Sequence, residues 1–119
     1  MPRNIVLIVL DSVRKDFFDR YANRLHQKSN VSIGQCRAVS SWSTPSHASI
    51  LTGTLPHKHG VHTHNPYFSK IGIEDTFLSD LNNYSLLAVS ANEYASPEFG
   101  FDYFFDEYNH IKPQIRYPE

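Results

Sequence analysis

Residues 4–11 read Asn-Ile-Val-Leu-Ile-Val-Leu-Asp, an unbroken aliphatic run that ends in a carboxylate. A strand buried on both faces within a parallel sheet has such a run, whereas a strand with one solvated face alternates apolar and polar residues. The six apolar residues are too few to cross a membrane, and no small-residue cleavage site follows them. We therefore expect the first strand of a parallel sheet here, rather than a membrane anchor or a signal peptide.

Strand and helix patterns alternate along the rest of the chain. In order, they predict a helix over 13–28, a weaker strand over 31–39, a helix over 45–51 that stops at Gly53, a short helix over 74–82 and a strand over 84–90. This order is typical of an α/β fold with a parallel sheet of about three strands and right-handed crossovers. We expect a single domain over 1–119, with an irregular but ordered loop over 54–69 and a loose tail over 109–119.

The charge balance excludes some classes of partner. The chain carries 11 basic and 12 acidic residues, for a formal net charge of -1. Bulk attraction to nucleic acid or to an anionic membrane is therefore not expected. Cys36 is the sole cysteine, which excludes a disulfide within the chain and favours a reducing, cytoplasmic compartment.

The most informative chemical feature is the stretch Trp-Ser-Thr-Pro-Ser-His-Ala-Ser-Ile-Leu-Thr-Gly at residues 42–53. It places the Ser43 hydroxyl at the start of a predicted helix, where main-chain N–H groups and the helix dipole stabilise negative charge. Ser43 either caps that helix, which is the commoner role of serine, or attacks a substrate after activation by a metal. His47 lies one helical turn further on and can reach the same anion pocket.

Polar residues follow the predicted strands at their carboxyl ends, where parallel sheets bind ligands. Asp11 ends the first strand and is either a helix cap or a metal ligand. Asn92 follows the strand over 84–90, so we expect Asp11, Ser43 and Asn92 at one edge of the sheet. Trp42 and Tyr94 either line a substrate pocket at that edge or belong to the core.

Two further clusters have competing interpretations. One consists of four alternating histidines, for which a zinc or nickel site competes with a polar surface loop: His57, His59, His62 and His64. The loop is favoured, since no acidic residue or thiol lies within the stretch. The other consists of Asp102, Asp106 and Glu107, for which acid–base chemistry competes with solvation of a packed turn. Solvation is the favoured interpretation there.

Three motifs together resemble the start of a sulfatase of the alkaline phosphatase superfamily. They are the aliphatic run at 4–11, Ser-x-Pro-Ser-His-Ala-Ser-x-Leu-Thr-Gly at 43–53, and Leu-Pro-His-x-His-Gly-Val at 55–61. The resemblance continues through 90–92 and 96–102 and so covers nearly the whole chain. It implies the amino-terminal part of an alkaline-phosphatase-like fold.

The resemblance also implies roles for individual residues. Asp11 falls on a metal-binding aspartate, Ser43 on the nucleophile that also ligates the metal, and His47 on a basic residue that supports the nucleophile. Asn92 and Tyr94 fall where the family carries a lysine and a histidine that hold the ester oxygens. The implied metal is calcium, with magnesium, manganese or zinc in relatives, and oxygen ligands fit such hard cations.

Departures from the family pattern modify these expectations. Formylglycine formation usually needs arginine where this chain has His47, so we expect Ser43 to remain a serine, as in the phosphatase and phosphodiesterase relatives. Ser12 stands where many sulfatases have a second aspartate, and Asn92 and Tyr94 should bind an anion more weakly than the lysine and histidine they replace. The expected substrate is a small-molecule sulfate or phosphate ester.

Family members continue for several hundred residues and supply an Asp-His or Asp-Asn pair that completes the metal site. Two protein ligands alone would bind a cation weakly, because calcium sites collect about six to eight oxygens. We therefore expect a hydrolase that is incomplete as a stand-alone chain and needs a second copy or a separately encoded carboxy-terminal half. The alternative is an inactive remnant or binding module that needs a partner chain.

Overall fold

The computed structural model describes residues 3–112, and the chain divides into two compact units. The amino-terminal unit is Met1–Arg37, and the carboxyl-terminal unit is Ala38–Glu119. No helix within residues 3–112 is long and apolar enough to span a membrane. Of the tail predicted over 109–119, residues 109 and 110 belong to a strand, and residues 113–119 lie outside the described part.

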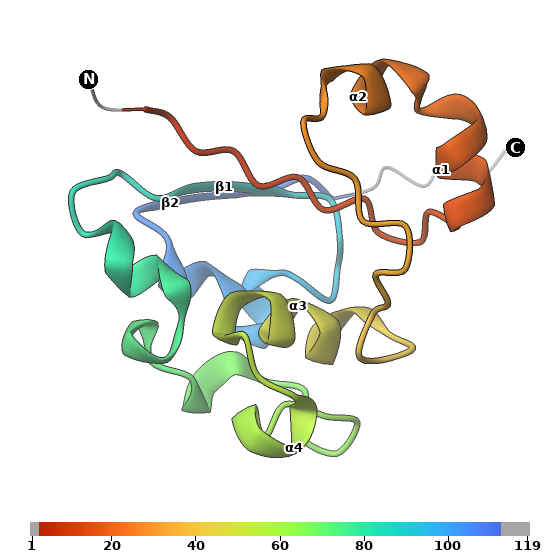
Figure 1. The fold of residues 1–119 in the computed structure, drawn as a ribbon. Helices are drawn as coiled ribbons and strands as arrows, with labels where there is room; N and C mark the ends of the chain where they lie inside the picture. The colour runs from red at the N-terminus through yellow and green to blue at the C-terminus, as the bar shows by residue number, and fades with distance from the viewer. Residues whose placement is uncertain (1–2, 113–119) are drawn as a thin grey trace, which may run out of the picture. The chain divides into compact units, whose positions relative to one another are not determined.

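The amino-terminal unit contains two short helices, α1 (Lys15–Tyr21) and α2 (Asn23–Lys28) (Figure 1). They cover most of the helix predicted over 13–28, which is interrupted at Ala22. Neither helix has a buried residue. The aromatic and aliphatic spacing thus identified the helical segment but not its break.

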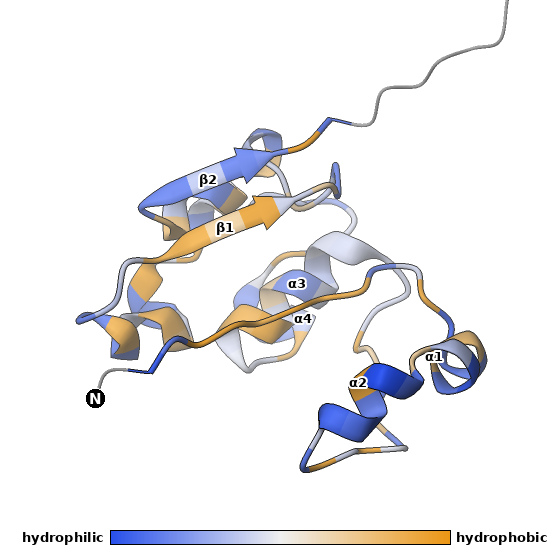
Figure 2. Ribbon diagram, turned by 90° about the horizontal axis from the view of Figure 1, so that it is seen from above, coloured by the Kyte–Doolittle hydropathy of each residue, from blue (hydrophilic) through white to orange (hydrophobic). Residues whose placement is uncertain are grey.

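The aliphatic run at 4–10 is not a strand, which corrects the prediction that the sheet starts there. Figure 2 shows the run in the hydrophobic colour, and the side chains from Ile5 to Leu10 are 42–78% exposed. The weaker strand predicted over 31–39 is also absent. Strand formation needs a second strand to pair its main-chain groups, and the pattern of one run does not specify that partner.

The carboxyl-terminal unit contains a parallel sheet of two strands, β1 (Leu87–Ser90) and β2 (Glu107–His110). Leu87 pairs with Glu107 and Ser90 with His110. Helices and a parallel sheet confirm the predicted α/β class, although the described residues hold two strands instead of about three. β1 lies within the strand predicted over 84–90. β2 was not predicted, and Figure 2 shows why, because β2 is mostly hydrophilic whereas β1 is hydrophobic.

Short helices precede β1 in the carboxyl-terminal unit, and others lie between β1 and β2 in the chain. In chain order they are α3 (Ser43–Thr52), α4 (Pro56–His59), η1 (Phe68–Lys70), η2 (Ile73–Asp75), η3 (Phe77–Leu81), η4 (Pro97–Phe99) and η5 (Phe101–Phe104), the η elements being 3₁₀ helices. The helix predicted over 74–82 thus corresponds largely to two 3₁₀ segments, η2 and η3. The loop predicted over 54–69 holds α4 and the start of η1.

α3 begins at Ser43, two residues before the predicted start, and its end agrees with the prediction. Pro45 is tolerated because the first N–H groups of a helix have no partner within it. Gly53 ends the helix with a φ of 65°, the left-handed conformation that glycine adopts without a steric penalty. Its N–H donates to the Ser49 carbonyl at 2.9 Å.

The core of the carboxyl-terminal unit forms between α3 and the aromatic segment around η5. The Phe68 ring lies 5.3 Å from the ring of Phe101 and 5.8 Å from that of Phe104. The buried hydrophobic residues are Ala48, Leu51, Val61, Phe68, Ile71, Leu78, Ala95, Phe101 and Phe104. Because Ala48 and Leu51 belong to this core, packing fixes α3 against the segment that follows β1.

Candidate functional site

Ser43 is the first residue of α3, and the preceding Trp42 is the N-cap. Ser43 thus lies one residue after the N-cap, and Trp42 itself makes no side-chain capping hydrogen bond. The Ser43 side chain is half-buried. Its hydroxyl starts a ten-residue helix, where the main-chain N–H groups favour an anion.

The loop after β1 contacts the start of α3. The buried Thr44 hydroxyl donates to the Tyr94 carbonyl at 3.3 Å, and the Trp42 and Tyr94 rings meet edge to face at 5.7 Å. Asn92 shapes that loop, because its side-chain oxygen accepts from the Tyr94 N–H at 2.8 Å. Trp42, Ser43 and Tyr94 therefore lie together, with Asn92 in the same turn as Tyr94.

His47 is held against the main chain of Ser43. Its Nδ1 lies 2.8 Å from the Ser43 carbonyl oxygen, so Nδ1 carries the proton and donates it. In the neutral ring Nε2 is then the acceptor nitrogen. The imidazole also stands edge to face with Phe101 at 6.1 Å. The hydrogen bond to the Ser43 carbonyl positions the residue that bears the hydroxyl. Catalytic participation of His47 stays a prediction.

Asp11 lies in a turn of the amino-terminal unit, and its carboxylate accepts from the Ser12 hydroxyl at 3.0 Å. The N-cap of α1 is Arg14, three residues after Asp11. Ser12 has a φ of 58°, an uncommon conformation for a residue with a Cβ. Asp11 and Ser43 belong to different units, and their pairing on a metal stays a prediction.

Within residues 3–112, no three acidic, cysteine or histidine side chains gather in an arrangement that could hold a metal ion. The predicted donors, Asp11 and Ser43, are too few for the six to eight oxygens typical of calcium.

The histidine cluster includes a structural link that the sequence did not indicate. His59 Nδ1 accepts from the Val61 N–H at 3.1 Å, and its Nε2 lies 2.9 Å from the Ser49 hydroxyl, which ties α4 to α3. Burial, with a smaller contribution from His57, lowers the pKa of His59 below its usual value. Both ring nitrogens of His59 are used in these contacts. This favours the interpretation of the cluster as a polar loop and disfavours the interpretation as a zinc or nickel site.

The acidic segment near β2 is more structural than predicted. Asp106 accepts from the Leu86 N–H at 2.8 Å and so fixes the chain where β1 begins. Asp102 does not simply solvate a turn, because its Oδ1 is buried and has no hydrogen-bond partner among the described residues. Burial, together with the charge of Asp102, raises the pKa of Tyr108, opposed by a hydrogen bond with Ser90.

Sequence reasoning missed His110 and Glu93. His110 is the last residue of β2, its side chain is only 10% exposed, and its Nε2 lies 3.7 Å from the Glu93 carboxylate. The pair joins the end of β2 to the loop that carries Asn92 and Tyr94. The unpredicted strand β2 hid this relationship, since nothing in the sequence placed His110 at the carboxyl edge of a sheet.

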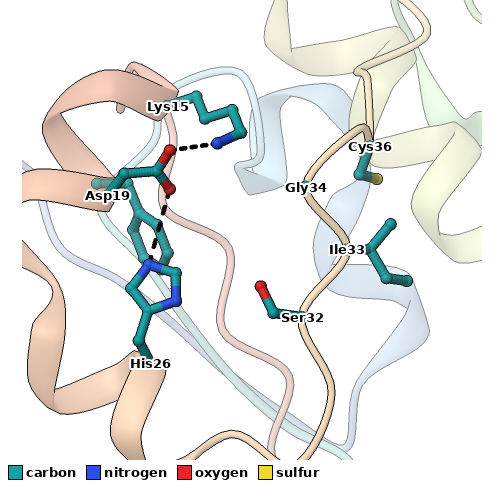
Figure 3. Close-up of a pocket in the computed structure, with 8 residues that line it drawn as sticks. Lys15, Asp19, His26, Ser32, Ile33, Gly34 and Cys36 are labelled. Atoms are coloured by element: carbon teal, nitrogen blue, oxygen red, sulfur yellow. Dashed lines mark hydrogen bonds and ion pairs between the residues drawn. The ribbon is translucent and has the colours of Figure 1, made fainter.

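The amino-terminal unit has a pocket of about 170 Å³ that contains none of the predicted site residues. Figure 3 shows Lys15, Asp19 and His26 on one side and Ser32, Ile33, Gly34 and Cys36 on the other. Lys15 forms an ion pair with Asp19, whose other oxygen lies 3.7 Å from His26. These groups already pair with one another.

The predicted site residues thus fall into two sets. Trp42, Ser43, His47 and Tyr94, with Asn92 nearby in sequence, gather around the start of α3, whereas Asp11 belongs to the other unit. Comparison with protein-family models, curated proteins and solved structures found no match to this chain.

Proposed function

We propose that this chain is the amino-terminal part of a sulfatase-like, metal-dependent hydrolase of sulfate or phosphate esters, with an alkaline-phosphatase-like fold. Ser43 is the nucleophile in this proposal. The observation that carries it is the position of Ser43 as the first residue of α3, beside Trp42 and the loop of Tyr94. Three motifs that resemble the sulfatase family lead to the same residue.

The helix start suits the chemistry of an anionic ester. Main-chain N–H groups there stabilise charge on the ester oxygens as it develops. Ser43 Oγ forms a bond to phosphorus or sulfur, the bond to the leaving oxygen breaks, and the leaving alcohol takes the proton that the serine loses. Water then releases the covalent intermediate. His47 contributes by holding the Ser43 main chain through its 2.8 Å hydrogen bond.

The proposal favours phosphate over sulfate esters. His47 replaces the arginine that formylglycine formation usually needs, so Ser43 acts as an unmodified serine. Asp11 is the proposed first metal ligand, and calcium is the proposed metal. Because the two proposed ligands, Asp11 and Ser43, are too few for calcium, a second copy or a separately encoded carboxy-terminal half supplies the others in this proposal. The lone Cys36 supports a cytoplasmic location.

A second candidate is a binding module without turnover. It is favoured by the exposed face of β1, where Leu87 is 66% and Val89 is 70% exposed. An apolar sheet face of this kind is normally covered by another element or another chain. In this case the start of α3 binds an anion but does not react with it.

Hydrolysis assays distinguish the two candidates. An aryl phosphate, a bis-aryl phosphate and an aryl sulfate are incubated with the protein and calcium, manganese or zinc, in the presence and absence of a co-expressed carboxy-terminal half. The enzyme proposal predicts metal-dependent hydrolysis that Ser43→Ala abolishes and Ser69→Ala, a change at an exposed serine outside α3, leaves intact. Equal rates for wild type and Ser43→Ala would overturn the nucleophile assignment.

A further inference from the structure

We propose that Tyr108 is a positioning residue for the reaction at Ser43, because its hydroxyl fixes the loop that packs against the start of α3. This segment, the β1 loop, comprises residues 91–95 and carries Asn92 and Tyr94. Its role in a reaction rests on the proposed function, whereas the contacts that fix the loop do not. Tyr108 belongs to β2 and was not among the predicted site residues.

The Tyr108 hydroxyl joins the two ends of the β1 loop. It donates to the carbonyl oxygen of Ala95, the last residue of the loop. It also forms a hydrogen bond with the hydroxyl of Ser90, which ends β1 and precedes the loop. A tyrosine hydroxyl can donate one hydrogen bond and accept another, so both contacts are compatible with its single proton. One side chain of β2 thus closes the loop at its base.

Hydrogen bonds within the β1 loop connect its two ends. The Ser90 hydroxyl oxygen accepts from the Asn92 N–H at 3.1 Å. The side-chain oxygen of Asn92 accepts from the Tyr94 N–H at 2.8 Å, and its carbonyl oxygen accepts from the Ala95 N–H at 3.1 Å. Because each bond links close neighbours in the chain, we expect a displacement at Ser90 or Ala95 to move Tyr94 as well.

The β1 loop contacts the start of α3 through Tyr94. The carbonyl oxygen of Tyr94 accepts from the buried Thr44 hydroxyl at 3.3 Å, and its ring meets that of Trp42 edge to face at 5.7 Å. Trp42 and Thr44 are the chain neighbours of Ser43. The hydrogen bonds of Tyr108 therefore act, through the loop, on both neighbours of the proposed nucleophile.

Tyr108 can hold the loop because its own ring is fixed by packing. The ring centre lies 5.8 Å from that of the buried Phe101 and 6.0 Å from that of Phe105. Burial, together with the charge of Asp102, raises the pKa of Tyr108 above its usual value, opposed by the hydrogen bond with Ser90. The hydroxyl therefore keeps its proton at neutral pH and can donate it to the loop.

Removal of the hydroxyl in Tyr108→Phe tests this role, and Trp42, the only tryptophan of the chain, reports the state of the loop. The phenyl ring retains the core packing but cannot form either hydrogen bond. We expect Trp42 to become more accessible to acrylamide and its emission to shift to longer wavelength, because the Tyr94 ring no longer covers it in a fixed position. Tyr103→Phe is the matched control and should leave both signals unchanged, since Tyr103 is 77% exposed.

Ser90→Ala is a second variant, which keeps the inference testable if Tyr108→Phe does not fold. It removes the other hydroxyl of the same hydrogen bond and should shift the Trp42 signals in the same direction. Because the two residues share a hydrogen bond, the shift in the double variant should be smaller than the sum of the single shifts. Unchanged Trp42 signals in folded Tyr108→Phe, or in Ser90→Ala where Tyr108→Phe does not fold, would overturn the inference.

Steady-state kinetics with an aryl phosphate, under the metal and partner conditions of the hydrolysis assay, separate positioning from stability alone. Because Tyr108 acts through the loop and not on the substrate, we expect Tyr108→Phe to lower kcat and leave KM nearly unchanged. The expected loss is about tenfold, since a misplacement of about 1 Å can cost about a hundredfold in rate. An unchanged kcat in the folded variant would overturn the positioning role. Trp42 signals that shift as expected, while no protein including wild type hydrolyses the ester, would contradict the proposed function and support the fixing of the loop by Tyr108.

Discussion

At the residue scale, the contact between His47 and Ser43 defines how the candidate site is built. The imidazole donates to the Ser43 carbonyl rather than acting through an acidic partner, which places its contribution in the first turn of α3. The spacing of the two residues predicted their proximity, since residues four apart share a helix face. The choice of the main-chain oxygen could not be predicted, because it depends on the side-chain rotamer.

We expect His47→Ala to lower the free energy of unfolding by about 1 kcal/mol, the usual net value of one hydrogen bond. Urea unfolding measures the change. His57→Ala is the matched control, because His57 is exposed. Equal losses for the two variants would show that the bond to Ser43 contributes nothing to stability.

The presence of histidine at position 47 predicts whether Ser43 is an unmodified serine or formylglycine. Since His47 stands where formylglycine formation usually needs arginine, the peptide that contains Ser43 should have the mass calculated from the sequence. Peptide mass spectrometry after expression with a formylglycine-generating enzyme checks this. A peptide with the mass of formylglycine, the aldehyde form, would contradict the unmodified serine and would favour sulfate esters as substrates.

At the element scale, the end of α3 depends on the left-handed conformation of Gly53. A Cβ built there meets no atom within 4 Å, so the penalty of a side chain comes from the backbone alone. We expect Gly53→Ala to cost about 1 kcal/mol of stability. Gly34→Ala is the control, because Gly34 has equal space and no positive φ, and it should be neutral or slightly stabilising. Similar losses in both variants would contradict this account of the helix end.

The link between α3 and α4 predicts a dependence of stability on pH. Because burial lowers the pKa of His59, the folded protein binds fewer protons there than the unfolded chain. This contribution to stability is full above the unfolded pKa of about 6.5 and declines as the pH falls from there toward the lower folded value. Urea unfolding across this window should show a smaller decline for His59→Gln than for wild type. Parallel pH profiles would show that His59 does not contribute.

Helices could be predicted from the sequence better than strands. The spacing within 45–51 and the stop at Gly53 are local signals, and α3 follows them closely. The run at 4–10 has the composition of a buried strand, yet its state depends on pairing that no local pattern describes. β2 is the opposite case, since Glu107, Tyr108, Asn109 and His110 have little strand signal and pair with β1 nonetheless.

At the scale of the whole molecule, the carboxyl-terminal unit combines a closed aromatic core with an open sheet face. Leu87 and Val89 stay exposed on one face of β1, while Tyr108 and Leu86 pack against the core. If another copy or chain covers that face, Leu87→Ser with Val89→Ser should reduce association measured by sedimentation. Tyr103→Ser, at another exposed residue, should not. A purely monomeric wild type that also ignores a co-expressed carboxy-terminal half would contradict the need for a partner.

The composition and motifs predicted the α/β class and most of the residues around α3, because these depend on local sequence. They did not predict that Asp11 and Ser43 fall in different units, or that His110 meets Glu93. Both relationships depend on how distant segments assemble. A test of the proposed reaction therefore has to measure the chemistry of Ser43 directly.

The most direct measurement is the detection of a covalent intermediate on Ser43. The protein is mixed with an aryl phosphate and a divalent metal, quenched in acid, digested and analysed by mass spectrometry. The account predicts a phosphoryl group on the peptide that starts α3, present in Ser69→Ala and lost in Ser43→Ala together with hydrolysis. Hydrolysis that proceeds equally well in Ser43→Ala, with no phosphoryl group on that peptide, would contradict it.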